Sequence, residues 1–476
     1  MIERAATLAV VALAVGCSAE PPSAIVINNV TVVDVETGDV HPDMAIHTRD
    51  GRIEGVRPAA DIETTGDVSV IDGSGTFAIP GLWDMHVHAL NSTDLSHLFL
   101  TLFVAHGITG FRDTWGSLDV AQQVTARFEN GDVLVPRFIL AGNLVDGPNP
   151  VWPTSVIADT PDRGAAIVDS LIDSGAAFIK VYSKLAPDVY HAIAERARER
   201  GVPFVGHVPS RVGVREAAAA GQSSMEHLNG VVVACSTEHE ALLGDINEWV
   251  DATARGETTE PYGALTNRVL TRALDTQPRA GCGDLLATLE THASYQVPTL
   301  VTLRGVRHMD DPEFQADPRL EYVPPSIRSF WKPGNQTYAT FTAEIQMRAM
   351  ERERTIVGMM DDAGVPLLAG SDTPNPYAFP GFGLHDELSL LVEAGLSPLH
   401  ALQAATIAPA QFLGAVDSLG TIAPGKVADL VLLEANPLED IDHVRQIRAV
   451  MLRGRYFDRD ALDGMLEEAK RFSNGG

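Results

Sequence analysis

Two histidines stand one residue apart at the end of an apolar stretch, in the segment FAIPGLWDMHVHAL (residues 77–90). Side chains alternate across a β-strand, so His86 and His88 share one face of a predicted strand with Asp84. Two imidazoles on one face either contribute to a shared metal site or fill part of a core. The pair therefore raises the question of whether further metal ligands lie elsewhere in the chain.

Residues of the same chemical kind follow other apolar, strand-like stretches. They are Lys180 in AFIKVYSK, His207 in VPFVGHVP, His227 in SSMEHLNG and Asp372 in LLAGSD. Any one of them alone is better explained as a packed, paired or helix-capping residue. Their common position and their order along the chain (His-X-His, Lys, His, His, Asp) favour one shared site.

Alternating strand and helix patterns fill the middle of the chain and would position these residues. Besides the strand of the opening motif, seven strand-like segments stand out: GITGFRDT (107–114), PRFILAG, AFIKVYSK, VPFVGHVP, SSMEHLNG, YQVPTLVTL and VPLLAGSD. Strand-then-helix repeats predict parallel strands, and eight such units close into a TIM-like (β/α)8 barrel, here residues 81–415. The C-terminal ends of its strands form the catalytic face. Residues 238–290 and 304–340 are predicted insertions over the barrel mouth.

The two ends of the chain carry a different pattern, with short alternating segments rich in Val and Ile. AIVINNVTVVDVETGDV begins the first group, and LGTIAPGKVADLVLLEANP (419–437) and IRAVMLRGRYFD (447–458) form the second. This pattern predicts strands. We expect residues 24–80 and 416–460 to build one small β-sandwich domain of this α/β protein, followed by a helical tail over 461–476.

The strand-end motifs resemble those of the amidohydrolase superfamily of metal-dependent hydrolases. GLWDMHVH, FIKVY, GHVP, SMEHLNG and LLAGSD match its motifs in order, and GKVADLVLLEANP is similar to its C-terminal sheet segment. The resemblance begins near residue 24, covers nearly the whole chain and is strongest to the prolidase-type and imidazolonepropionase-related branch. GHVPS and EHLNG depart from the HAHG and EHG of many prolidase-type members. These departures alter the pocket wall and keep the ligands.

The resemblance implies a binuclear metal centre, usually of two Zn²⁺ ions. His86, His88 and Asp372 would hold one ion, His207 and His227 the other, and Lys180 would bridge both as N-carboxylysine. A lysine amine in an apolar strand has a lowered pKa and is nucleophilic towards CO2, and the resulting carbamate offers two oxygens. Metal-bound hydroxide would attack a carbonyl, and Asp372 would carry the proton to the leaving nitrogen.

Four further residues are candidates around this centre. Tyr182 lies two residues after Lys180, points the same way and is expected to bind the substrate's carbonyl oxygen or carboxylate. Arg112, at the end of the second strand, is expected to bind a substrate carboxylate or to pair with a neighbouring aspartate. His385 opens a helix beyond the last strand and faces either the mouth or the surface. Asp84 either orients a ligand or makes a turn contact.

The implied function is hydrolysis of a C–N amide bond in a small carboxylate-bearing molecule, such as a dipeptide or an N-acyl amino acid. The same centre would also serve a cyclic amide, a lactone or an ester. A third interpretation, from another class, is a metal-binding or ligand-binding scaffold without catalysis. The complete ligand set argues against the scaffold, and a mononuclear deaminase would leave Lys180 without a role.

The composition limits the partners. A formal net charge of −28 over 476 residues argues against nucleic acid or an anionic membrane surface. An anionic substrate would therefore need a local cation. A small-molecule substrate is expected, and a homo-oligomer is left open.

The N-terminus MIERAATLAVVALAVGC predicts export. Its apolar run is too short to span a bilayer, and the segment 1–17 resembles a bacterial lipobox signal in which Cys17 is lipidated. An ordinary signal peptide cut near Ala19 is the alternative. Either one places the mature chain in the periplasm or cell envelope. In that oxidising compartment Cys235 and Cys282 either pair or remain two unrelated buried thiols.

Overall fold

The computed structural model describes residues 24–61, 68–131, 133–258, 260, 262–276, 278–332 and 342–475. The predicted signal segment 1–17, with Cys17, lies outside the described residues. Among the helices that are described, none is long and apolar enough to cross a membrane.

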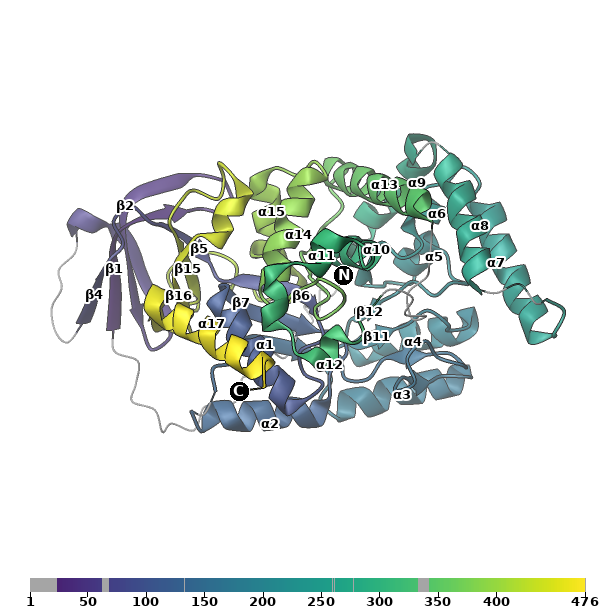
Figure 1. Ribbon diagram of the computed structural model, residues 1–476, viewed down its shortest axis with the longest axis horizontal. Helices are drawn as coiled ribbons and strands as arrows, with labels where there is room; N and C mark the ends of the chain where they lie inside the picture. The colour runs from purple at the N-terminus through teal and green to yellow at the C-terminus, as the bar shows by residue number, and fades with distance from the viewer. Residues whose placement is uncertain are drawn as a thin grey trace, which may run out of the picture.

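Both ends of the chain meet in one eight-stranded sheet at one end of the molecule (Figure 1). Its strands are β1 (Ala24–Val33), β2 (Val40–Arg49), β3 (Arg52–Pro58), β4 (Val68–Asp72), β5 (Phe77–Pro80), β15 (Leu430–Leu433), β16 (Ile447–Leu452) and β17 (Arg455–Asp458). Their order is β17-β16-β15-β5-β1-β2-β3, and β4 pairs with β1. Because β5 is parallel to β1 and antiparallel to β15, it joins the N-terminal and C-terminal strands.

The hairpin between β2 and β3 shows how the sequence dictates this sheet locally. Its turn residues Asp50 and Gly51 have φ angles of 50° and 71°. Two successive positive φ angles are the signature of a tight hairpin turn whose twist matches that of the strands, and Asp-Gly is a favoured pair for it. Alternate residues such as Ile27, Ile46 and Leu430 then pack into one apolar core.

Parallel strands in the middle of the chain form two further sheets. A three-stranded sheet has the order β6 (Leu82–Val87), β7 (Ile108–Asp113), β8 (Arg137–Leu140). A six-stranded sheet has the order β10 (Val156–Ile157), β9 (Val145–Asp146), β11 (Ile179–Val181), β12 (Phe204–Gly206), β13 (Ser224–Glu226), β14 (Tyr295–Val297).

Backbone contacts connect these two sheets at both ends. Leu367 forms a parallel bridge with Gln296 of β14, and Thr373 forms one with Val87 of β6. At the other junction, Ala177 N donates to Leu140 O at 2.8 Å. The predicted strand VPLLAGSD is therefore represented by a short bridging segment rather than a full strand.

Helices alternate with these strands. They are α1 (Thr93–Ala105), α2 (Leu118–Glu129), α3 (Pro161–Asp173), α4 (Pro187–Arg200), α5 (Val214–Ala219), α13 (Ala343–Asp362), α14 (Phe382–Glu393), α15 (Pro398–Ala404) and α16 (Ile407–Phe412). Local signals explain their ends. Thr160 accepts a hydrogen bond from Arg163 N before Pro161 opens α3, and Gly201, with φ 67°, closes α4. The last helix, α17 (Arg459–Ser473), packs on α1.

The segment YQVPTLVTL differs from its prediction. It forms strand β14 only as far as Val297, and α10 (Leu300–Arg307) follows. Pro298 has no N–H to continue the strand ladder, and Thr299 takes a φ of 48° at the helix start. The apolar run is therefore a strand followed by a buried helix, which hydrophobicity alone does not distinguish.

The two long excursions are largely helical. The first follows α6 (Val231–Ala234) and contains α7 (His239–Ala254), α8 (Tyr262–Asp275) and α9 (Pro278–Thr291). The second contains α11 (Pro312–Gln315) and α12 (Pro325–Arg328). In Figure 1, α7 and α8 lie at the end of the molecule opposite the eight-stranded sheet.

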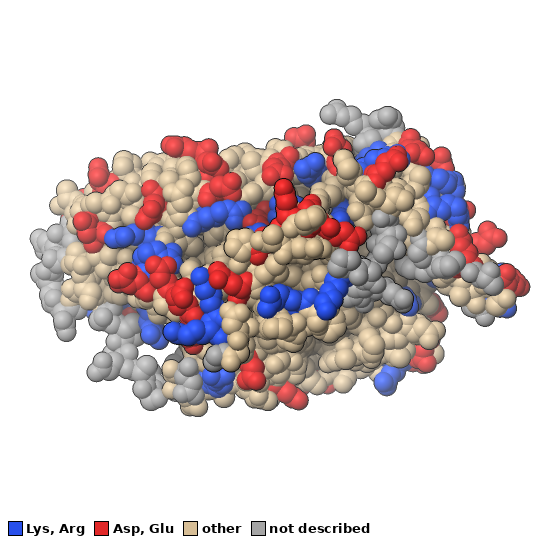
Figure 2. Space-filling model, viewed as in Figure 1, with Lys and Arg blue, Asp and Glu red and all other residues tan. Residues whose placement is uncertain are grey.

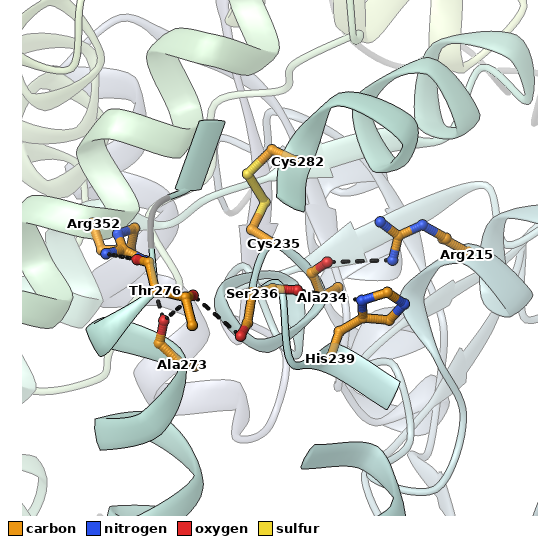
Figure 3. Close-up of a disulfide and its surroundings, with 9 residues drawn as sticks. All are labelled: Arg215, Ala234, Cys235, Ser236, His239, Ala273, Thr276, Cys282 and Arg352. Carbon is orange, nitrogen blue, oxygen red and sulfur yellow. Dashed lines mark hydrogen bonds between the residues drawn. A yellow bond between two sulfur atoms is a disulfide. The ribbon is translucent and has the colours of Figure 1, made fainter. Parts of the chain in front are cut away.

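A disulfide ties the first excursion to the residue that follows α6. Cys235, just after α6, is bonded to Cys282 in α9, so the structure pairs the two cysteines (Figure 3). Beside them Arg352 of α13 donates to the carbonyl oxygens of Ala273 and Thr276 at the end of α8. A guanidinium at this position satisfies carbonyls that a helix end leaves unpaired.

Candidate metal centre

Three of the predicted ligands converge at the ends of their strands. His88 Nε2 lies 2.9 Å from Asp372 Oδ1, and His86 Nε2 lies 3.4 Å from the same oxygen. One ligand atom from each residue fits within 4.8 Å of the others. Backbone hydrogen bonds hold this arrangement, because Asp372 N donates to His86 O at 2.7 Å and His88 N donates to Thr373 O at 2.8 Å.

The remaining predicted ligands lie beside this group in the same cavity. The ring centroids of His86 and His227 are 4.5 Å apart, and those of His207 and His227 are 5.0 Å apart. Lys180 is 1% exposed, and its Nζ has no hydrogen-bond partner among the described residues. All six predicted ligands line one cavity. Within the described chain, only His86, His88 and Asp372 form a group of three such residues whose ligand atoms all lie within 4.8 Å of one another.

The protonation states suit a cation. Burial lowers the pKa of His86 and His207 well below the ordinary value, and burial lowers that of His227 to about 4. Burial alone would raise the pKa of Asp372, but His227 and His88 more than offset it, so the net shift is downward. These imidazoles are neutral and the carboxylate is ionised at neutral pH. Such nitrogen and oxygen donors are the ligands that Zn²⁺ accepts.

Burial also lowers the pKa of Lys180 to about 8, although Glu226 and Asp372 act in the opposite direction. A substantial fraction of this amine is therefore neutral near pH 7 to 8, the form that is nucleophilic.

Partners that the sequence did not reveal fix the imidazole rings. Nδ1 of His86 lies 2.7 Å from a carboxylate oxygen of Glu226. His207 Nδ1 lies 2.8 Å from Ser183 Oγ, and His227 Nδ1 lies 2.7 Å from Thr299 Oγ1. The carboxylate of Glu226 accepts from Nδ1 of His86, which leaves Nε2 of that ring to bind a metal. The hydroxyl partners of His207 and His227 are compatible with the same tautomer. The only sequence signal was an acid, Glu226, within a strand; the two hydroxyl residues carried none.

Arg112 does not take the role expected from sequence. It is fully buried, and its Nη2 donates to both carboxylate oxygens of Glu226 at 3.0 and 3.2 Å. Its Nε donates to Met85 O, and its Nη1 donates to Ser224 Oγ. Arg112 does not line the cavity. It pairs with the carboxylate that holds His86, not with a substrate or a neighbouring aspartate.

His385 is also placed away from the cavity. It is buried in the first turns of α14, and its Nε2 lies 2.9 Å from the carbonyl oxygen of His106 at the end of α1. His385 therefore lies neither at the mouth of the cavity nor at the surface, the two positions expected from sequence. It makes a packing contact between helices α14 and α1.

Tyr182 and Asp84 lie near the centre. The Tyr182 ring stacks on His207 with centroids 3.9 Å apart, lines the cavity and accepts a hydrogen bond from Trp152. Asp84 accepts hydrogen bonds from both the backbone and the hydroxyl of Ser371, at 2.9 and 2.6 Å, and thereby orients the residue preceding Asp372. Burial raises the pKa of Asp84 to about 7.

The sequence of this chain is similar to those of several known proteins. Residues 343–456 match the model of the amidohydrolase family. The resemblance to the amidohydrolases is confirmed. An imidazolonepropionase of Symbiobacterium thermophilum is 24% identical over 404 residues, which is 83% of this chain and 84% of that protein. An adenine deaminase of a Chelativorans species is 28% identical over 211 residues, and the match spans only 34% of its length.

Solved amidohydrolase structures share the fold. A bottromycin amidohydrolase has a TM-score of 0.74 at 24% identity, covering 95% of this chain and 91% of that one. A Xaa-Pro dipeptidase with bound methionine has a TM-score of 0.67 at 18% identity, covering 92% and 100%. These likenesses give an α/β protein with a TIM-type barrel and a second domain.

Proposed function

We propose that this chain is a metal-dependent hydrolase that cleaves a C–N amide bond. The observation that carries the proposal is the convergence of His86 Nε2, His88 Nε2 and Asp372 Oδ1 in one cavity. The family match and the likeness to a prolidase, a Xaa-Pro dipeptidase and a bottromycin amidohydrolase support the same reaction class.

The donor set fits two divalent ions, with zinc as the first choice. His86, His88 and Asp372 would hold one ion, His207 and His227 the second, and Lys180 would bridge them as a carbamate. Three buried atoms without a hydrogen-bond partner among the described residues support this assignment: His86 Nε2, Lys180 Nζ and Asp372 Oδ1. A buried polar atom without a partner costs free energy, which metal coordination or carboxylation of the lysine would recover.

The ions, when bound, acidify a water and polarise the carbonyl of the substrate. The protein supplies the remaining steps. Asp372 Oδ1 lies beside His86 and His88, and Oδ2 lies 3.5 Å from His227 Nδ1. Oδ2 would take the proton from the attacking water and return it to the leaving nitrogen. The contact of Asp84 with Ser371 holds this carboxylate in place, and the ring of Tyr182 forms the adjoining wall.

A second candidate is hydrolysis of an uncharged lactone, ester or cyclic amide by the same residues. The largely apolar side chains of the cavity favour such neutral carbonyl compounds. A metal-binding scaffold without catalysis would use the same ligands, so turnover is the observation that separates it from a hydrolase.

Metal analysis and an Asp372→Asn variant test the proposal. The zinc-loaded protein is expected to hydrolyse members of a panel of dipeptides, N-acyl amino acids, simple amides, lactones and cyclic amides. Asp372→Asn should lower kcat by at least about 100-fold, because it removes both a ligand and the proton carrier. Asp361→Asn is the matched control, since Asp361 pairs with His400 on the surface at 2.9 Å. Two bound metals without any turnover would favour the scaffold.

The domain division is part of the same proposal. Residues 81–415 would form a closed (β/α)8 barrel, with residues 24–80 and 416–460 as a composite β-sandwich domain and 461–476 as a tail. The bridges of Leu367 and Thr373 and the hydrogen bond of Ala177 support closure of the barrel. Export as a lipoprotein through Cys17, or through an ordinary signal peptide, is proposed from the sequence.

A further inference from the structure

The cavity above the candidate metal centre is large. Its volume is about 570 Å³. Sites of this size enclose drug-sized ligands rather than the smallest amides. The side chains around it therefore decide which class of molecule fits, and they differ from those expected for a carboxylate-bearing substrate.

One wall of the cavity is aromatic and reaches the metal centre at two points. The rings of Trp115 and Trp152 lie 5.2 Å apart, and Trp115 lies 5.7 Å from the ring of His88. Trp152 Nε1 donates to Tyr182 Oη, and the Tyr182 ring stacks on His207. The wall thus runs from one strand-end histidine to another, next to the position of the scissile bond.

A second wall of the cavity is aliphatic and aromatic. It is formed by Leu303 and Val306 of α10, Ile327 of α12, and Phe330 and Trp331 beyond it. Trp331 is 5% exposed and is fixed by a hydrogen bond from its Nε1 to Pro374 O at 3.0 Å. Two apolar walls in one cavity favour a substrate with a flat or bulky apolar group.

Cations that could bind a substrate carboxylate are already engaged. Among the described residues that line the cavity, the only Lys and Arg are Lys180 and Arg307. Both terminal guanidinium nitrogens of Arg307 bond to Glu353, with Nη2 donating to Oε1 at 2.7 Å, and Glu353 is 7% exposed. Lys180 lines the cavity together with the imidazoles, and in the proposed centre its amine would be a carbamate, which is an anion. Residues 333–341, which are outside the described residues, contain no Lys or Arg in sequence.

We infer that the site takes uncharged amides that carry an aromatic or similarly bulky apolar group, and that it discriminates against substrates with a free carboxylate. The inference rests on the proposed amide hydrolysis and specifies its substrate class. A carboxylate buried between these walls would lose its hydration without gaining an unpaired cation, and the net charge of −28 opposes its approach. The aromatic pair would instead contact a neutral ring beside the scissile bond.

Three amides with one skeleton test the charge preference. Phenylacetanilide is neutral; its two partners carry one carboxylate at the para position of either the anilide ring or the phenylacetyl ring. Water adds across the C–N bond in each case, and the released aniline or aminobenzoate is measured. With the zinc-loaded full chain, we expect kcat/KM for the neutral amide to exceed both charged ones by roughly tenfold or more. Equal or faster cleavage of either charged amide overturns the inference.

Trp152→Ala tests the aromatic wall. It should raise KM for phenylacetanilide by roughly tenfold, as truncation of a central aromatic contact does, with kcat changed much less. Trp152→Phe should retain most of the affinity, because it keeps an aromatic ring in the wall. Together with the nearly unchanged kcat of Trp152→Ala, this result would exclude misfolding as the cause of the raised KM. Trp249→Ala is the matched control, because Trp249 is a half-buried tryptophan of α7 that does not line the cavity. An unchanged KM in Trp152→Ala contradicts the assignment of the wall.

Failure of the proposed function is distinguishable from failure of this inference. If none of the three amides is cleaved, their equilibrium binding to the same enzyme is measured by calorimetry. If the neutral amide binds more tightly than the two charged ones, and Trp152→Ala weakens its binding, the inferred class of ligand is supported even though hydrolysis is not. Tighter binding of a carboxylate, or no binding of the neutral amide, overturns it.

Discussion

Lys180 occupies surroundings that are unusual for a lysine. It lies in β11 between Ile179 and Val181, both fully buried, and its amine has no hydrogen-bond partner among the described residues. A buried ammonium without a partner is costly, so the group is more stable when it is neutral or chemically modified. Carboxylation would convert this unpaired amine into an anion that faces four imidazoles.

Lys180→Ala should abolish activity and be partly rescued by a small carboxylate. Loss of a supporting contact to a ligand typically costs 10- to 100-fold, so loss of a bridging ligand should lower kcat by more than about 100-fold. Added acetate or propionate should restore part of it by replacing the carbamate. Steady-state rates with and without added carboxylate are the measurement.

The control for this variant is Lys184→Ala, since the amine of Lys184 bonds only to the carbonyl oxygen of Asn149 on the surface. Full activity of Lys180→Ala, or equal losses in both variants, would contradict the bridging role.

Glu226 holds His86 and is itself held by Arg112, and all three side chains are fully buried. Glu226→Gln removes the charge that fixes the protonated nitrogen of His86 and leaves Arg112 without its counter-ion. Metal affinity should fall by about 10- to 100-fold, measured by competition with a chromogenic chelator. The free energy of unfolding should also fall, by about 3 kcal/mol or more, because a buried guanidinium loses its partner.

Glu216→Gln provides the surface counterpart of that experiment, because Glu216 and His191 form an exposed pair at 2.7 Å. It should change neither metal affinity nor stability. Wild-type metal affinity in Glu226→Gln would show that Glu226 does not position the ligand.

Residues at strand ends were predictable from sequence, and their supporting partners were not. The period of a strand places His86 and His88 on one face, and parallel strands bring Asp372 to the same edge. The partner of Arg112 instead lies on β13, which is not a neighbour of β7 in either sheet order. Such a contact crosses the interior, so only the three-dimensional arrangement of the strands reveals it.

At the level of elements, Glu387 links α14 to α10, the helix that lines part of the cavity. It lies in α14, is fully buried, and one of its oxygens accepts a hydrogen bond from Val301 N at the start of α10 at 2.8 Å. Burial raises its pKa to about 8, although the hydrogen bonds from Val301 and Leu300 oppose the shift. The helix start is thus held by a carboxyl group that remains protonated at neutral pH.

This raised pKa predicts a pH dependence of stability. Below pH 4.5 the group is protonated in both states; between 4.5 and 8 only the folded state retains the proton. Stability should therefore fall as pH rises through this window, by at most roughly 1.4 kcal/mol per pH unit. Urea titrations at pH 5, 6.5 and 8 give the free energy of unfolding of wild type and of Glu387→Gln. The advantage of wild type over the variant should decrease as pH rises.

Glu393→Gln serves as the control on the same helix, because the Glu393 side chain is 55% exposed and contacts Arg354. The difference in free energy of unfolding between Glu393→Gln and wild type should not vary over the same pH range. A flat difference for Glu387→Gln would show that the carboxyl is ionised in the folded protein.

The prediction of elements succeeded where periodicity and end signals coincide. The helices α3 and α4 carry both an apolar period and a proline start, and they alternate with strands as the sequence pattern indicates. The start of α10 was not, because the apolar run PTLVTL suits a buried strand and a buried helix equally. In the helix that forms, Val301 N near its start donates a hydrogen bond to Glu387, a residue distant in sequence.

At the level of the whole molecule, acidic residues outnumber basic ones. Acidic and basic side chains are interspersed on the face shown in Figure 2, although the chain carries 63 acidic and only 35 basic residues. The excess of negative charge favours solubility and repels anionic partners. A neutral substrate can approach the site without opposition from this field.

The composite sheet makes the fold of the whole chain depend on both of its ends. Strand β5 exchanges hydrogen bonds with β15 over Phe77–Pro80, and Leu430, Leu432 and Met451 pack against Ile27 in one core. A chain that ends at residue 417 loses β15, β16 and β17, exposes an apolar strand edge and leaves half of this core uncovered. We expect it to be insoluble, or to elute as aggregates in size-exclusion chromatography.

Co-expression of residues 418–476 as a separate fragment should restore a soluble complex, because the missing strands pair through backbone contacts that do not require a continuous chain. Deletion of residues 475–476 alone is the control and should leave solubility unchanged, since the last helix ends at Ser473. A soluble, monomeric chain ending at 417 with native circular dichroism would contradict this dependence. The barrel would then fold without the sheet, and the C-terminal strands would be an addition to it rather than part of its support.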